Sequence, residues 1–230
     1  MRNAKLFHKT KGLIRDFVFG MQDGLISNLG LVLGVWQGGG GKIAIVLAGL
    51  SSMFAGAFSM STGSYLSAKS QREVYEQEIR MAQEDVKNNP NRNLKKMQPI
   101  LQQEGFDKDE VQALLNHFKN HNQSTFTINY IQKKLGLSEQ RLDLPLKNAF
   151  TMFLSFLVGS LFPILPFAFL ENSTAVFVAS SITIVVLFMV GWTKSLYTKM
   201  NFIRSGLEIV TVGIISGIIG YIVGYIFSII

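Results

Sequence analysis

A carboxylate stands within the first long apolar stretch of this 230-residue chain. It is Asp23, and it belongs to a series of small and polar residues spaced alternately by four and three: Asp16, Gly20, Asp23, Ser27, Gly30 and Gly34. Residues at this spacing share one face of an α-helix. A charged side chain in hydrocarbon costs at least about 2.5 kcal/mol unless it faces protein, water or a cation. If the stretch crosses a membrane, Asp23 and Ser27 are predicted to bind a cation. The alternative is an Asp that joins helices through a hydrogen bond.

A second apolar stretch carries methionine and hydroxyl side chains at a similar spacing: Met53, Ala57, Met60, Ser64 and Ser67. If this stripe faces Asp23, a cation would meet carboxylate, hydroxyl or carbonyl oxygen together with thioether sulfur. That mixture suits ferrous iron better than calcium. The predicted ligands here are Met53 or Met60, with Ser64. The alternative is that the methionines only fill space between helices.

Acidic residues follow the second stretch. Glu73, Glu76 and Glu84 fall within about one helical face, because 11 residues make almost three turns. Their oxygens are predicted to collect a divalent cation, and the alternative is a solvated acidic face interleaved with arginines. His117 and His121 are spaced to share a metal, but no third ligand accompanies them.

Other chemistries are excluded by composition. With no cysteine there is no disulfide framework, thiolate cluster or cysteine nucleophile. No serine–histidine–aspartate set or phosphate-binding glycine loop is present, so we predict neither an enzyme nor a tightly bound cofactor. The net charge of +7 fits basic loops of a membrane protein, and nucleic acid is not an expected partner.

The elements that must position these residues are apolar helices. The chain is 48% hydrophobic and only 16% charged, with a mean hydropathy of +0.27. Apolar runs near the 20 or so residues needed to cross a bilayer occur at about 13–36, 43–68, 146–170, 174–197 and 206–230. We therefore predict an all-α, five-span transmembrane protein with a cytoplasmic helical insert between spans two and three. The predicted divisions are 1–69 for spans one and two, 70–145 for the cytoplasmic helical domain, and 146–230 for spans three to five.

The basic residues predict the orientation. If the spans alternate, 21 of the 22 lysines and arginines fall on one side of the membrane. The positive-inside rule then places the N-terminus and the polar block in the cytoplasm. The expected location is the cell membrane, with a vacuolar or other internal membrane as the alternative.

Helix ends are also predicted from the sequence. The second span should continue as one helix to Asn88-Asn89-Pro90, and Gly105 and Gly136 should end two later helices. Asp107 and Glu110 have the spacing of a capping box. Pro163 and Pro166 are expected to kink the third span or end its regularity. The last span carries a small-residue stripe that predicts a helix-packing or dimer face: Gly206, Gly213, Gly217, Gly220 and Gly224.

Two motifs resemble a known family. DGLISNLGLVLGV at 23–35 resembles the first span of the vacuolar iron transporter family, and GAFSM at 56–60 with GSYLS at 63–67 and SQRE at 70–73 resembles its second span. The likeness covers nearly the whole chain. It implies a homodimer in the lipid bilayer that moves ferrous iron, often manganese, out of the cytosol, in proton exchange where that is assigned. It also implies Asp23 as a membrane-site ligand beside Met53 or Met60.

The chain departs from the family pattern in two places. Ser64 stands where the second motif commonly has Glu, so one expected carboxylate is absent. In the insert, Glu73, Glu76 and Glu84 match the metal-collecting pattern, but Lys87 occupies its fourth position, and Lys133 and Lys134 precede Leu135 where Met and Glu are expected. Two alternatives therefore accompany metal export: a family member with a changed substrate, and a non-transporting membrane scaffold or sensor.

Overall fold

The computed structural model describes residues 2–121 and 144–229, and it describes side-chain surroundings for 12–117, 144–171 and 173–229. Every regular element in these residues is an α-helix. The chain divides into two compact units, one of residues 10–67 and 144–230 and the other of residues 1–9 and 68–143. Helix α2 contributes residues to both units.

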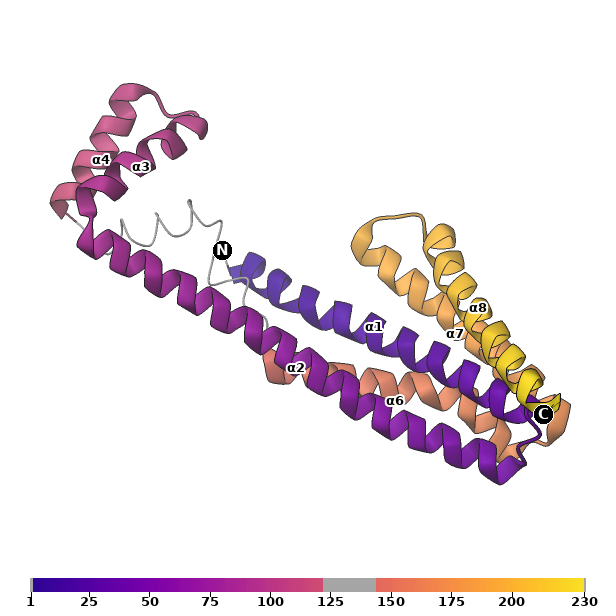
Figure 1. Cartoon of the computed structure of the whole chain (residues 1–230). Coiled ribbons are helices and arrows are strands. Elements are labelled where there is room, and N and C mark those ends of the chain that lie inside the picture. The colour runs from indigo at the N-terminus through magenta and orange to yellow at the C-terminus, as the bar shows by residue number, and fades with distance from the viewer. Residues whose placement is uncertain (1, 122–143, 230) are drawn as a thin grey trace. The chain divides into compact units, whose positions relative to one another are not determined.

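Among the residues just given, five helices are long and apolar enough to cross a membrane, which confirms the five-span prediction. They are α1 (Arg2–Gln37), α2 (Lys42–Asn88), α6 (Pro145–Phe169), α7 (Asn172–Thr198) and α8 (Phe202–Ile229) (Figure 1). Many of the exposed side chains in their membrane-length segments are apolar, as lipid requires. On α8, for example, Ile215, Ile219 and Phe227 are exposed.

Helices α1 and α2 form a hairpin with a short connection. The chain turns through Gly39, whose φ of +84° lies in the left-handed region that glycine adopts without strain. Gly38 N donates to Gly34 O at 2.9 Å, and Gly40 N donates to Val35 O at 2.9 Å, which satisfies carbonyls at the end of α1. The two helices therefore run in opposite directions.

Helix α6 continues through both of its internal prolines. Pro163 and Pro166 are buried, and the helix ends at Phe169, beyond both of them. The prolines therefore do not end the regularity of this span, and that half of the expectation is wrong, while the kink stays a prediction. Burial of the proline rings among neighbouring helices supports a continuous helix where the local sequence alone favours a break.

The glycines of α8 pack inside the chain. A Cβ on Gly220 would meet the carbonyl oxygen of Gly30, and one on Gly224 would meet that of Gly34. Near the start of α8, Gly206 lies against Phe188 of α7. The stripe is thus a helix-packing face that lets α1 and α7 approach closely, and these positions are occupied within one chain.

The second unit contains the end of α2 and two short helices, α3 (Pro90–Gln103) and α4 (Lys108–His121). These helices stand between the second and third spans in the sequence, and their cytoplasmic location remains a prediction. Their core is a cluster of four buried apolar side chains: Val86, Met97, Leu101 and Val111.

The helix ends in this unit follow the sequence signals. Helix α2 ends at Asn88, where Asn93 Nδ2 donates to the carbonyls of Asp85 and Asn89 at 2.9 and 3.1 Å. Gly105 has a φ of +97° just after α3. The predicted capping box is confirmed, because Glu110 N donates to Asp107 Oδ1 at 2.8 Å while Asp107 N donates to Glu110 Oε2 at 2.9 Å.

Candidate functional site

Asp23 lies near the middle of the membrane-length part of α1. Its side chain is half-buried, and no residue in the described part of the chain pairs with its carboxylate. Ser27, one turn further on, is exposed and donates its hydroxyl to the Asp23 carbonyl at 2.6 Å. Phe19, one turn earlier, is 50% exposed. One face of α1 therefore presents a carboxylate that the single chain leaves uncovered.

Asp16 is the acidic residue of α1 that meets the second span. It is only 2% exposed, and the Ser64 hydroxyl donates to its Oδ2 at 3.3 Å. Arg15 Nε donates to Asp16 Oδ1 at 3.1 Å. Ser64 therefore donates a hydrogen bond to the Asp16 carboxylate of the first span, at the position where the family motif commonly has Glu.

The contact between Asp16 and Ser64 sets the register of the hairpin. Since α1 and α2 run in opposite directions with the same rise per residue, Asp23 lies at about the level of Ala57. Met60 is three residues from that level, about 4.5 Å along the axis, and Met53 is four residues away on the other side, about 6 Å. Both methionines therefore lie within about one turn of Asp23 in depth.

The surroundings of the two methionines differ. Met53 is 5% exposed and belongs to an apolar cluster with Ile164 and Phe167 of α6 and Ala175 of α7. This environment matches the space-filling alternative. Met60 is half-buried, so its sulfur is the less enclosed of the two.

Close packing of α1 on α6 forms a wall beside the face that carries Asp23. A Cβ on Gly20 would meet the Ser155 hydroxyl, and one on Gly24 would meet the carbonyl oxygen of Phe156. The α1 stripe predicted from the sequence therefore does not face α2 alone: Asp16 meets α2, Gly20 meets α6, and Gly30 meets α8.

A buried polar pair crosses this wall. Asn28 is fully buried, and its Nδ2 donates to Ser160 Oγ at 2.9 Å and to Gly24 O at 3.2 Å. Its Oδ1 has no hydrogen-bond partner in the described residues. Asn28 and Asp16 were not among the predicted ligands. The sequence offered one signal for each residue: Asn28 lies one turn after Gly24, and Asp16 lies one turn before Gly20.

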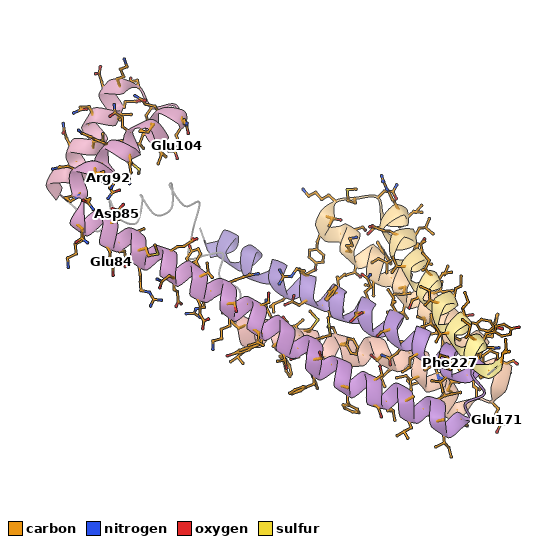
Figure 2. The ribbon with its side chains drawn as sticks, in the orientation of Figure 1. Glu84, Asp85, Arg92, Glu104, Glu171 and Phe227 are labelled. Carbon is orange, nitrogen blue, oxygen red and sulfur yellow. The ribbon has the colours of Figure 1, made fainter. Side chains whose placement is uncertain are left out.

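The acidic residues of α2 beyond residue 68 do not form a cluster that could bind a metal in the described residues. Glu73 pairs with Lys69 at 3.7 Å, and Glu76 pairs with Arg72 at 2.8 Å. Figure 2 labels Glu84 beside Asp85 on the same helix. No three histidine or acidic side chains come together to hold a metal anywhere in residues that the structure describes. These contacts match the solvated-face alternative for Glu73 and Glu76.

Some sequence predictions fall outside the described residues. They concern Lys133, Lys134, Leu135 and the helix end at Gly136, together with the side chain of His121.

Five membrane-length helices and a carboxylate placed within one of them define a multi-pass membrane protein. A family model described as the VIT family matches residues 14–225. The chain belongs to the VIT family.

Characterised relatives are similar over most of their length. Vacuolar iron transporter 1 of Arabidopsis thaliana is 29% identical over 211 residues, which cover 91% of this chain and 84% of the relative. Vacuolar iron transporter of Plasmodium falciparum (isolate 3D7) is 28% identical, with 90% and 79% covered. Protein CCC1 of Saccharomyces cerevisiae is 26% identical, with 87% and 65% covered.

Proposed function

We propose that this protein exports a divalent metal, ferrous iron or manganese, from the cytosol in exchange for protons. Family membership and the names of the iron-transporting relatives support the class of substrate. The observation that carries the proposal is the Asp23 carboxylate, which is half-buried in a membrane-length helix and has no partner among the residues that the structure describes. An unpaired acid at such a position is costly unless a cation or water occupies it.

The proposed membrane site combines Asp23 and Ser27 of α1 with Met60 of α2, while Met53 and Ser64 remain candidates from the sequence. Carboxylate and hydroxyl oxygens with one thioether suit a borderline metal. The contacts of Met53 with apolar side chains favour Met60 as the sulfur ligand.

The proposal includes a homodimer. Asp23, Ser27 and Phe19 leave a partly polar face of α1 uncovered in one chain, and lipid is a poor solvent for it. A second copy would cover this face and enclose the pathway. Because the sequence contains no cysteine, single-cysteine variants can test the contact without background. Phe19→Cys should form a disulfide-linked dimer in membranes, and Phe177→Cys, on an exposed position of α7, should not.

The transport test uses purified protein in liposomes with a metal-quenched dye. We expect uptake of ferrous iron and manganese that a pH gradient accelerates, and we expect Asp23→Ala and Asp23→Asn to reduce uptake to the level of empty liposomes. Glu171→Gln, which changes an acid of the α6–α7 connection (Figure 2), is the control and should transport as the parent does. Parental uptake by Asp23→Ala would refute the proposal.

A second candidate is a non-transporting membrane scaffold or sensor. It is favoured by the ion pairs that occupy Glu73 and Glu76 and by the absence of a clustered acid site in the described residues. Two results together would support this candidate: the folded, dimeric protein transports neither ferrous iron nor manganese in liposomes, and the full-length protein binds a partner protein. Flux of a different ion would instead support a changed substrate.

A further inference from the structure

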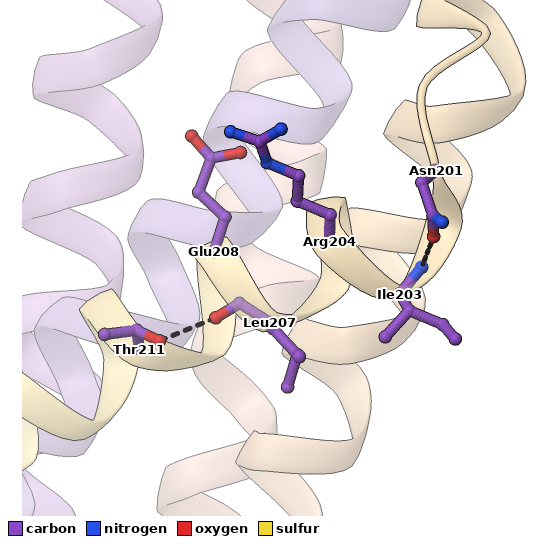
Figure 3. A pocket seen from close by; sticks show the side chains of 6 residues that line it. All are labelled: Asn201, Ile203, Arg204, Leu207, Glu208 and Thr211. Atoms are coloured by element: carbon purple, nitrogen blue, oxygen red, sulfur yellow. Dashed lines mark hydrogen bonds between the residues drawn. The ribbon is translucent and has the colours of Figure 1, made fainter.

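The connection between α7 and α8 and the first turns of α8 form an open groove, which both polar and apolar side chains line. Its volume is about 490 Å³, and six residues line it: Asn201, Ile203, Arg204, Leu207, Glu208 and Thr211 (Figure 3). The groove is distinct from the Asp23 face, since it lies on the first turns of α8.

The local sequence builds this corner. Helix α7 ends where Lys199 adopts a left-handed φ of 56°, and α8 begins at Phe202. Asn201 Oδ1 accepts a hydrogen bond from Ile203 N at 2.9 Å, which caps the first turn of α8.

Among the described residues, the two charged side chains that line the groove differ in their pairing. Glu208 is held by Lys194, whose Nζ lies 3.2 Å from Glu208 Oε2. Arg204 is exposed and has no ion pair or hydrogen bond in the described part of the chain. Its guanidinium presents a planar fork of donors that fits a phosphate oxygen pair.

Aromatic side chains near the end of α7 indicate that this corner of the protein lies at headgroup depth. Trp192 and Tyr197 of α7 are 50% and 56% exposed, and such aromatic side chains are enriched at membrane–water interfaces. Below Arg204 the lining becomes apolar, with Leu207 54% exposed, and the Thr211 hydroxyl is turned to the Leu207 carbonyl at 2.8 Å. A ligand here would meet Arg204 at one end, beside the Lys194–Glu208 ion pair, and the aliphatic surface of Leu207 at the other.

We propose that this groove binds an anionic phospholipid, with its phosphate on Arg204 and an acyl chain along Leu207 and Thr211. Arg204 has no ion pair in the described residues, Glu208 beside it is neutralised by Lys194, and Leu207 follows one turn deeper, so a cation above aliphatic surface matches the order of groups in a lipid. A soluble phosphate would use only the upper half of the groove. The inference does not depend on metal transport.

The test uses the full-length protein in detergent, titrated with phosphatidylglycerol or phosphatidylcholine, with bound lipid measured by native mass spectrometry and stability by Tm. We expect phosphatidylglycerol to bind in preference and to raise the Tm. Arg204→Gln should weaken the apparent affinity for phosphatidylglycerol by about fivefold or more. The affinity of Arg204→Lys should lie between those of the parent and Arg204→Gln, because lysine keeps the charge but lacks the planar fork of donors. Lys199→Gln removes the same charge from the same connection and should stay within about twofold of the parent.

A second variant fills the groove without changing its charge. Leu207→Trp should lose phosphatidylglycerol binding while its Tm without lipid stays near that of the parent. Equal binding of both lipids, parental affinity in Arg204→Gln or Leu207→Trp, or an equal loss in Lys199→Gln would overturn the proposal. So would a Tm increase with inorganic phosphate as large as that with phosphatidylglycerol.

Discussion

The Ser64 hydroxyl lies 3.3 Å from Asp16 Oδ2 and donates a hydrogen bond to it, joining the first and second spans. The acid is buried, and Arg15 supplies a charged partner at 3.1 Å. This contact lies seven residues before Asp23, about 10 Å along the axis of α1. The two acids of α1 therefore differ: Asp16 accepts hydrogen bonds from Arg15 and Ser64, whereas the Asp23 carboxylate has no partner in the described part of the chain.

Replacing the hydroxyl with an acid should create a cation site at this contact. In Ser64→Glu a second carboxylate would stand beside Asp16, so we expect a lower Tm in the absence of metal. Manganese at 100 times its dissociation constant should restore about 2.7 kcal/mol of stability. Ser67→Glu, on an exposed position of the same helix, is the control and should show no metal-dependent Tm. If manganese does not raise the Tm of Ser64→Glu, the expectation is wrong.

The contact between α1 and α8 should tolerate no added methyl group. Gly220→Ala forces a Cβ against the Gly30 carbonyl, and overpacking of this kind costs about 1–3 kcal/mol. We therefore expect a Tm lower by at least about 2 °C. Gly63→Ala is the matched control, because a Cβ there meets nothing within 4 Å and alanine is the better helix former. Thermal unfolding in detergent would measure both, and equal Tm values would refute the packing argument.

The buried pair Asn28 and Ser160 should show a measurable interaction energy. Hydrogen bonds between membrane helices average about 0.6 kcal/mol and reach about 1.7 kcal/mol. A double-mutant cycle of Asn28→Ala and Ser160→Ala should fall in this range. Pairing Asn28→Ala with Ser195→Ala is the control, because Ser195 bonds within its own helix to the Trp192 carbonyl. An interaction energy no larger than that of the control would show that the Asn28–Ser160 hydrogen bond does not stabilise the folded protein.

The acidic residues of α2 should contribute little to transport. Glu73 and Glu76 already form exposed ion pairs with Lys69 and Arg72, and such pairs are weak. We expect the triple variant Glu73→Gln, Glu76→Gln and Glu84→Gln to transport within about twofold of the parent. The liposome assay measures this beside Asp23→Ala, which should be inactive. A large loss in the triple variant would instead support the metal-collecting role predicted from the sequence.

The sequence by itself determined the spans and the helix ends. Hydropathy over 20 or so residues depends only on local composition, and it predicted five membrane-length helices that the structure contains. The breaks at Asn88 and Gly105 and the capping box of Asp107 and Glu110 were equally predictable, since backbone groups at a helix end are satisfied by residues within one turn.

Only the tertiary structure decided which residues meet between helices. The stripe through Asp16, Gly20 and Gly30 looks uniform in the sequence, yet its members contact α2, α6 and α8 respectively. Met53 and Met60 have similar local contexts, but one is enclosed by apolar side chains and the other is half-buried. These outcomes depend on the rotation and register of each helix, and packing against all neighbours sets both at once.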